Sequence, residues 1–254
     1  MIVTVCEFPD EAHRKDSAWN GLVEAASEQE SDLVVLPEMP FCPWIFVGES
    51  IDESQWKQAI SDHEKMIDRL HELRADYVIS SRPTQIGSRR LNQGFIWSKL
   101  EGYRSARAKW YLPDEPTGRE ATWFDKGDRH FQPERIGEVI IGLQLCSEMM
   151  YPEHARELGS LGAHIIAQPR ASSDAQRWPV AAAMSAIVSG CFVLSTNRRS
   201  LESNRFPGGS WIISPDGVVL ASTTQGAPAV TLSISLEVAE QAKNSYPRDM
   251  YRRY

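Results

Sequence analysis

The sequence predicts an α/β fold, a layered sandwich in which helices cover mixed β-sheet. Two observations lead to this prediction: short β-branched runs alternate with amphipathic helical segments, and both parallel strand–helix–strand units and antiparallel hairpins are indicated. No linker, internal repeat or low-complexity block interrupts the 254 residues. We therefore expect residues 1–254 to form a single domain.

The first half of the chain opens with a strand–helix–strand unit. Strands are expected at 2–8 and 32–36, and apolar residues recur at helical spacing across 11–30 between them. Such a unit favours a parallel strand pair. The other elements expected in this half are a helix over 53–74 and strands over 76–81, 92–98, 103–110 and 137–145.

The second half repeats this pattern. Pro152 stands near the first position of a predicted helix, where a missing N–H costs nothing. The turn residues Pro215–Asp216–Gly217 indicate a hairpin. The expected elements are helices over 152–161, 175–189 and 236–243 and strands over 163–168, 191–197, 209–214, 218–222 and 230–234.

Composition excludes several functional classes. The formal net charge, 27 − 34 = −7, argues against nucleic acid or an anionic membrane as the main partner. No apolar run approaches the roughly 18 residues of a transmembrane helix, and the N-terminus does not resemble a signal peptide. The four cysteines lie too far apart for a CxxC pair, which argues against zinc and a disulfide framework. We expect a cytoplasmic globular protein without a metal.

Cys146 is the best candidate for a nucleophile. It follows an apolar strand and precedes a helical segment, and a helix N-terminus favours a thiolate. The competing interpretation is a buried, inert thiol, which we prefer for Cys6, Cys42 and Cys191.

A cysteine nucleophile needs a base, and none of the six histidines has a setting that recommends it. Glu38 and Lys109 each stand at the end of a predicted strand, as Cys146 does. Each of the two charges alone is typical of a protein surface. Because the ends of parallel strands converge on one crevice, we expect the three side chains to meet there.

Several segments together resemble the nitrilase superfamily of carbon–nitrogen hydrolases, in that family's order and over almost the whole chain. The segments are LPE at 36–38, Asn92, AKWYLPDE around Lys109, EATWFDKGD at 120–128, GLQLCSEMMYPEHARELGSLGA at 142–163, STNR at 195–198 and GGSWIISPDG at 208–217.

This resemblance implies a four-layer α-β-β-α sandwich with two mixed β-sheets. It implies that Glu38 is the general base, Lys109 the oxyanion stabiliser and Cys146 the nucleophile, with no metal or organic cofactor. Glu120 is expected to be the second glutamate, and Glu115 is the competing choice.

Substrate-binding residues are predicted around Cys146 and after a later strand. Ser147 stands where many relatives have a bulky Trp or Tyr, and Glu148 and Met149 follow it, so the pocket wall is expected to differ. The further candidates, which would bind a carboxylate or line an apolar pocket, are Arg170, Arg177 and Trp178.

The predicted activity is thiol-dependent hydrolysis of a small linear amide, N-carbamoyl amine or N-carbamoyl amino acid through a Cys146 thioester. A nitrilase, an acyl-transfer enzyme and a non-catalytic member of the same fold remain as alternatives. Relatives usually oligomerise, and the Tyr- and Arg-rich tail at 244–254 suits a subunit contact, so a homodimer or larger homo-oligomer is expected.

Overall fold

Strand β1 (Ile2–Pro9) lies at the centre of the molecule and takes part in two sheets. In the computed structural model, which describes residues 1–116, 118–173 and 175–251, the first part of β1 pairs in parallel with β2 (Leu33–Val35) and antiparallel with β14 (Ala229–Ser233). The end of β1, Glu7–Pro9, pairs in parallel with β11 (Phe192–Arg199). The two sheets are therefore joined at the end of this strand.

Both sheets contain parallel and antiparallel strands. The first continues from β2 through β3 to β4 and β5, and the second from β11 through β10 to β9 and β8, with β12 and β13 added beside β11. The bounds are β3 Tyr77–Ile86, β4 Arg89–Ser98, β5 Gly102–Ala108, β8 Glu134–Ile136, β9 Val139–Leu143, β10 Ile165–Arg170, β12 Trp211–Ile213 and β13 Val219–Ser222. A short hairpin outside these sheets pairs β6 (Asp114–Glu115) with β7 (Gly118–Arg119).

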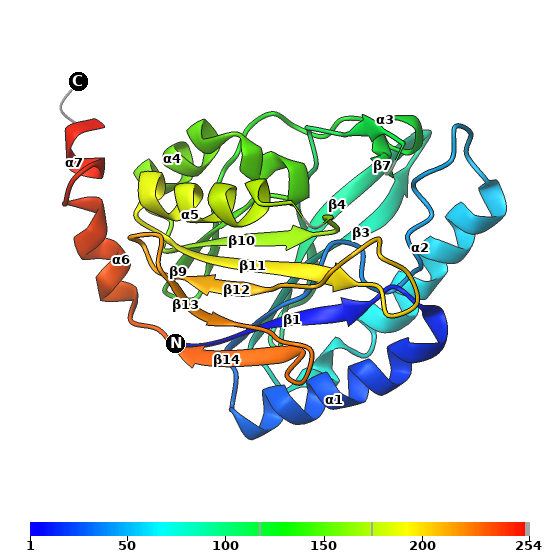
Figure 1. Cartoon of the computed structure of the whole chain (residues 1–254), viewed down its shortest axis with the longest axis horizontal. Coiled ribbons are helices and arrows are strands. Elements are labelled where there is room, and N and C mark those ends of the chain that lie inside the picture. The colour runs from blue at the N-terminus through cyan, green and yellow to red at the C-terminus, as the bar shows by residue number, and fades with distance from the viewer. Residues whose placement is uncertain (117, 174, 252–254) are drawn as a thin grey trace.

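Helices cover the outer face of each sheet (Figure 1). Helices α1 (Lys15–Glu28) and α2 (Glu53–Ile67) lie on the first sheet, and α4 (Pro152–Ser160) and α5 (Arg177–Ser189) on the second. The order is therefore helix, sheet, sheet, helix, which confirms the predicted α-β-β-α sandwich. The remaining helices are α3 (Glu120–Trp123), α6 (Leu236–Lys243), α7 (Arg248–Tyr251) and 3-10 turns at Ala12–Arg14, Leu70–Leu73 and Cys146–Met150.

The alternation of side chains along β1 shows how the layers are made. Val3 and Val5 point into the apolar cluster between the two sheets, whereas Cys6 and Phe8 point toward α1. Successive side chains of a strand face opposite sides, so a strand that is apolar on both faces is buried on both. This pattern places β1 in the interior.

The structure differs from the predicted elements mainly at their ends. The helix expected over 53–74 ends at Ile67, and a separate 3-10 turn follows, closed by Arg74 with φ +58°. The strand expected over 137–145 is β9, and β8 precedes it as an unpredicted antiparallel partner. Gly137, with φ +57°, makes the turn between them, as glycine can at little cost.

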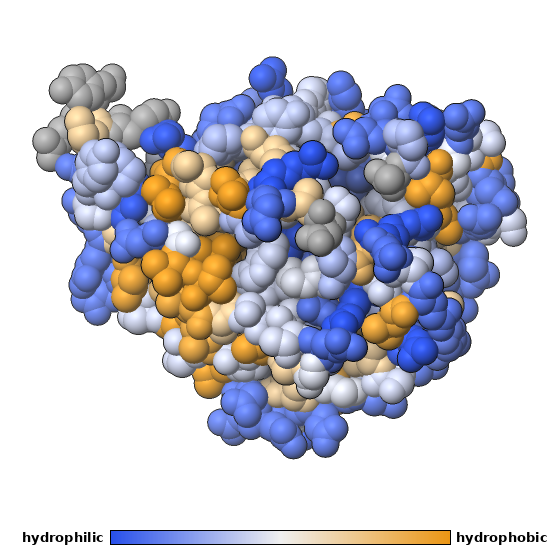
Figure 2. Space-filling view, viewed as in Figure 1, coloured by the Kyte–Doolittle hydropathy of each residue, from blue (hydrophilic) through white to orange (hydrophobic). Residues whose placement is uncertain are grey.

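Apolar side chains remain exposed on one face of the second half. Figure 2 shows them gathered over the region of α5 and β13. The exposed apolar residues there are Val180 and Met184 of α5, Val218 just before β13, and Val219 and Leu220 of β13. None of the helices in the described ranges combines the length and the hydropathy that a membrane crossing needs. Residues 252–254 of the tail predicted to contact another subunit lie outside the described residues.

Candidate active site

Lys109, just after β5, lies between two buried carboxylates. Its Nζ is 2.8 Å from Oε1 of Glu38, and it is 2.8 Å from both carboxylate oxygens of Glu120. Glu38 follows β2 and Glu120 begins α3, so three separate segments meet here. Lys109 and Glu38 are fully buried and Glu120 is 3% exposed. The structure thus brings these three candidates together.

Asn92 on β4 completes this cluster. Its Nδ2 donates to Oε1 of Glu38 at 2.8 Å and approaches Oε2 of Glu120 at 3.5 Å. Oε1 of Glu38 therefore accepts from both Lys109 and Asn92. Oε2 of Glu38 is buried and has no hydrogen-bond partner within the described ranges. A buried carboxylate oxygen without a donor is available to accept a proton.

Cys146 begins the 3-10 turn that follows β9. Its φ is +47°, an uncommon backbone conformation for a residue other than glycine and one that costs of order 1–3 kcal/mol. The side chain is 4% exposed. Strain of this kind persists only where surrounding structure enforces it, and it is common at functional sites.

The electrostatics of Cys146 correct one expectation. The position at a helix start predicted a stabilised thiolate, but burial, followed by the nearby Glu38 carboxylate, raises the pKa of the Cys146 thiol well above its ordinary value. Lys109 and the backbone N–H of Ala171 act in the opposite direction without reversing the shift. The thiol form is therefore the resting state, and a base must remove its proton.

The ionisation of Lys109 and Glu120 is set by their common burial. Burial alone would lower the pKa of Lys109, but the carboxylates of Glu120 and Glu38 overcome it and raise that pKa. Burial raises the pKa of Glu120 to about 7, against the opposing effect of Lys109. Lys109 thus stays charged at neutral pH, whereas Glu120 titrates in that range.

The structure separates the two candidates for the second glutamate. Glu115, in the outer hairpin β6–β7, is exposed, whereas Glu120 contacts the ammonium of Lys109 directly. Within the described ranges, no group of three or more His, Cys, Asp or Glu side chains is arranged to hold a metal ion.

Glu148 and Met149 do not form a pocket wall as the sequence suggested. Glu148 is fully buried, where it pairs with Arg107 and accepts hydrogen bonds from the backbone N–H groups of Trp110 and Leu145, each at 2.8 Å. Met149 packs in the apolar cluster beneath α4 and α5. Both side chains are engaged by other groups of the protein, which gives them a structural role in the fold.

Ser147 lies at the edge of the site, partly exposed, and its Oγ donates to the carbonyl of Tyr111 at 2.5 Å. Arg177 is exposed at the start of α5. Arg170 and Trp178, in contrast, line one common pocket of about 170 Å³. Of these three predicted substrate-binding residues, Arg170 and Trp178 therefore share a cavity, and Arg177 faces solvent.

Sequence reasoning did not assign a role to Asn92 or Arg107, although both contact candidate residues. A signal was available for Asn92, because an amide in an otherwise apolar run, QGFIWS, needs a buried partner. Arg107 gave no comparable signal, since its partner Glu148 is 41 residues away.

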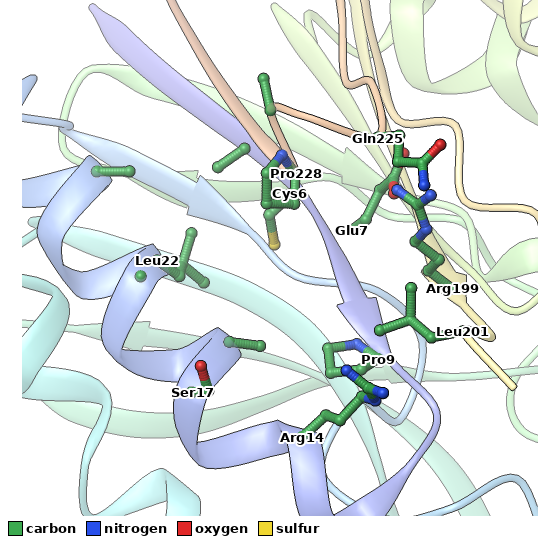
Figure 3. Close-up of a pocket in the computed structure, with 15 residues that line it drawn as sticks. Cys6, Glu7, Pro9, Arg14, Ser17, Leu22, Arg199, Leu201, Gln225 and Pro228 are labelled. Atoms are coloured by element: carbon green, nitrogen blue, oxygen red, sulfur yellow. The ribbon is translucent and has the colours of Figure 1, made fainter.

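The site does not coincide with a larger cavity of about 680 Å³ between α1 and the end of β1 (Figure 3). That cavity is lined by Cys6, Glu7, Arg199 and Gln225, among others, and by none of the cluster around Lys109. The thiol of Cys6 points to the carbonyl of Val35, and burial raises its pKa. We take the Lys109 cluster as the candidate site. Burying ionisable groups costs free energy, and clusters of such groups are typical of functional sites.

Known proteins resemble this chain over much of its length. The sequence model described as carbon-nitrogen hydrolase matches residues 17–244. The chain is 27% identical to a deaminated glutathione amidase of Rattus norvegicus over 147 residues, 56% of this chain and 45% of that protein. It is 26% identical to a nitrilase of Pyrococcus abyssi over 206 residues, 80% of this chain and 76% of that protein. The first match thus spans less than half the length of the relative.

Solved structures share the fold at lower identity. A carbon-nitrogen hydrolase from Helicobacter pylori G27 superposes with a TM-score of 0.82 at 21% identity, covering 100% of this chain and 95% of that one. A mutant of the amidase from Nesterenkonia sp. AN1, which carries the product of acrylamide addition at its active-site cysteine, superposes with a TM-score of 0.76 at 16% identity. It covers 100% of this chain and 99% of that one.

Proposed function

The chain belongs to the carbon-nitrogen hydrolase family, the nitrilase superfamily, and we propose that it hydrolyses small linear amides, N-carbamoyl amines or N-carbamoyl amino acids through a thioester on Cys146. One observation carries the proposal. The buried ammonium of Lys109 lies 2.8 Å from Glu38, whose second carboxylate oxygen has no partner in the part of the chain that the structure describes, and the charges of both act on Cys146.

In the first half of the reaction, Glu38 takes the proton of the Cys146 thiol through Oε2, and the sulfur attacks the amide carbon. The oxyanion that develops on the former carbonyl oxygen is stabilised by the Lys109 ammonium and the backbone N–H of Ser147. Glu38 returns the proton to the nitrogen, the C–N bond breaks, and ammonia or an amine leaves.

In the second half, the same carboxylate removes a proton from water as the water attacks the thioester. The C–S bond breaks, the carboxylic acid leaves, and Cys146 regains its proton. Glu120 keeps Lys109 charged and oriented, because it contacts Nζ through both oxygens. The raised pKa of the Cys146 thiol makes a neighbouring base necessary.

The proposal is tested by ammonia release from a panel of ω-amides, aliphatic amides, N-carbamoyl amino acids and nitriles. We expect turnover of at least one amide or carbamoyl compound, and we expect Cys146→Ala to abolish it. Cys42→Ala is the matched control, because Cys42 is also buried with a pKa raised to about 11. Full activity of Cys146→Ala would exclude the mechanism.

Two further measurements separate the alternatives. If an acid's nitrile is converted and its amide is not, the enzyme is a nitrilase, a name that the Pyrococcus abyssi relative carries. If added hydroxylamine is acylated faster than water, acyl transfer is the main reaction. A non-catalytic protein would turn over none of these compounds and would show four equally slow thiols toward iodoacetamide.

We also propose that the protein forms a homo-oligomer through the exposed apolar face of α5 and β13. Val180 is 62% exposed and Val218 58%, and large exposed apolar patches commonly mark protein interfaces. Sedimentation velocity on the wild type should give a dimer or larger species, and Val180→Glu should shift it to monomer. A monomeric wild type would contradict the proposal.

A further inference from the structure

A pocket of about 170 Å³ lies where the end of β10 meets the start of α5. Its walls include Arg170, Trp178, Asn197, Gly209 and Trp211. It lies close to the candidate active site, because the carbonyl of Arg170 accepts a hydrogen bond of 3.3 Å from the backbone N–H of Glu38. The backbone N–H of the next residue, Ala171, acts on the Cys146 thiol.

Arg170 reaches this pocket as a buried cation that has no carboxylate partner among residues 1–116, 118–173 and 175–251. It is 1% exposed, and its donors go to Oγ of Ser195 at 2.8 Å, Oγ of Ser172 at 2.6 Å and the carbonyl of Gly209 at 2.5 Å. These bonds use the N–H of Nε and one N–H each of Nη1 and Nη2. Two of the five N–H groups, one on Nη1 and one on Nη2, therefore remain without an assigned acceptor. No ion pair joins Arg170 to any residue of the described ranges.

The charge of Arg170 is therefore incompletely compensated. Burial lowers the pKa of Arg170 to about 9, and no carboxylate of the described residues counteracts this shift. The face of Trp211, with its ring centre 4.2 Å from Cζ, supplies a cation–π contact. Neutral hydroxyl and carbonyl acceptors and a ring face replace only part of the hydration that a guanidinium loses.

A second donor at the same pocket also lacks an acceptor. Nε1 of Trp178 is buried and has no hydrogen-bond partner among the described residues. Asn197 does not supply one: its Oδ1 accepts from the backbone N–H of Ser172 at 2.9 Å, and its Nδ2 donates to the carbonyls of Ser172 and Gly208. Arg170 and Trp178 therefore both bring N–H groups to this pocket that have no acceptor among the described residues.

We propose that this pocket binds a carboxylate group through the free N–H groups of Arg170 and Nε1–H of Trp178. A carboxylate accepts from two guanidinium N–H groups at once and supplies the missing negative charge. The carboxylate belongs either to the substrate itself or to a separate small acid. Only the effect on turnover rests on the proposed function, because carboxylate binding is measurable without catalysis.

Binding is measured by calorimetry on the Cys146→Ala variant, which cannot consume an amide. Succinate is the probe, and succinamide is its neutral match. We expect succinate to bind at least tenfold more tightly than succinamide, because a hydrogen bond to a charged group contributes about 1.5–3 kcal/mol. Equal affinity for the two compounds would overturn the proposal.

Variants in the same background identify the donors. Arg170→Gln should remove the preference for succinate, and Trp178→Phe, which keeps the ring and loses only the N–H, should weaken succinate about tenfold. Arg177→Gln is the matched control, because Arg177 is exposed beside the pocket and does not line it. If Arg170→Gln does not fold, Trp178→Phe decides: unchanged succinate affinity in a folded variant overturns the proposal.

Kinetics on the active enzyme identify the source of the carboxylate. If the substrate carries it, Trp178→Phe raises the KM for succinamate by a larger factor than the KM for butyramide. If a separate acid supplies it, added succinate alters the turnover of butyramide without competing with it. Succinate binding in a protein that hydrolyses no amide would overturn the proposed function and still support the carboxylate pocket.

Discussion

Arg107 and Glu148 form an ion pair inside the protein, with side chains 7% and 0% exposed. The same carboxylate accepts hydrogen bonds from the backbone N–H groups of Trp110 and Leu145. Trp110 follows Lys109, and Leu145 precedes Cys146. Glu148 thereby ties the segment that carries the candidate oxyanion stabiliser to the segment that carries the candidate nucleophile.

Glu148→Gln should destabilise the protein by about 3–5 kcal/mol, because it leaves the buried Arg107 without its counter-charge. Urea unfolding measures the change. Glu134→Gln is the matched control: it breaks the pair with Arg104, whose side chains are about one-third exposed, and should cost less than about 1 kcal/mol. Similar losses in the two variants would show that Glu148 has no special structural role.

Glu38→Gln should reduce kcat about 10²–10⁴-fold, because the amide cannot accept the proton of the Cys146 thiol. It should also slow alkylation of Cys146 by iodoacetamide. Glu115→Gln, in the exposed hairpin, should leave both rates unchanged. Wild-type turnover in Glu38→Gln would mean that another group is the base.

The ionisation of Glu120 should make the folded protein less stable as the pH rises from about 4.5 to 7. The pKa of this carboxyl is raised from 4.5 to about 7, first of all by burial, so the folded state holds the proton more tightly than the unfolded state. Between about pH 4.5 and 7 the free energy of unfolding therefore falls with rising pH, by up to about 3 kcal/mol from this group.

Urea unfolding at pH 5, 6, 7 and 8 tests this dependence. Glu120→Gln removes the titrating group and should flatten the curve over that interval. An equal pH dependence in the wild type and in Glu120→Gln would contradict the raised pKa.

Gly127→Ala should disturb the position of Lys109. A Cβ at Gly127 would lie 2.2 Å from the carbonyl oxygen of Ala108, and the N–H of Gly127 donates to the carbonyl of Lys109 at 2.8 Å. Such overpacking costs about 1–3 kcal/mol, and we expect kcat to fall with it.

Gly21→Ala is the opposite case. Gly21 lies in α1 with no atom within 4 Å of an added Cβ, so the change should stabilise the protein by about 0.5–1 kcal/mol. Thermal unfolding compares the two variants. If Gly127→Ala were tolerated as well as Gly21→Ala, close packing against β5 would not be what holds Lys109.

Most elements of the fold were predictable because their patterns are local. The alternation in β1 and the turn residues Pro215–Asp216–Gly217 each act over a few neighbouring residues. That β1 belongs to both sheets was not predictable, because its second pairing is with β11, 190 residues later. Helix ends were also missed, as at Ile67, because nearby packing rather than periodicity decides where a helix stops.

The sequence by itself determined the layered α/β class and placed Glu38, Lys109 and Cys146 at strand ends, where the chain direction brings them to one edge. The sequence favoured Glu120 over Glu115, and the contact with Lys109 was visible only in the tertiary structure. Tertiary structure also buried Glu148 against Arg107 and left Arg170 without a carboxylate in the described ranges. The reason is physical. Strand and helix patterns are local, whereas the ionisation and availability of a side chain depend on burial and on partners that are distant in sequence.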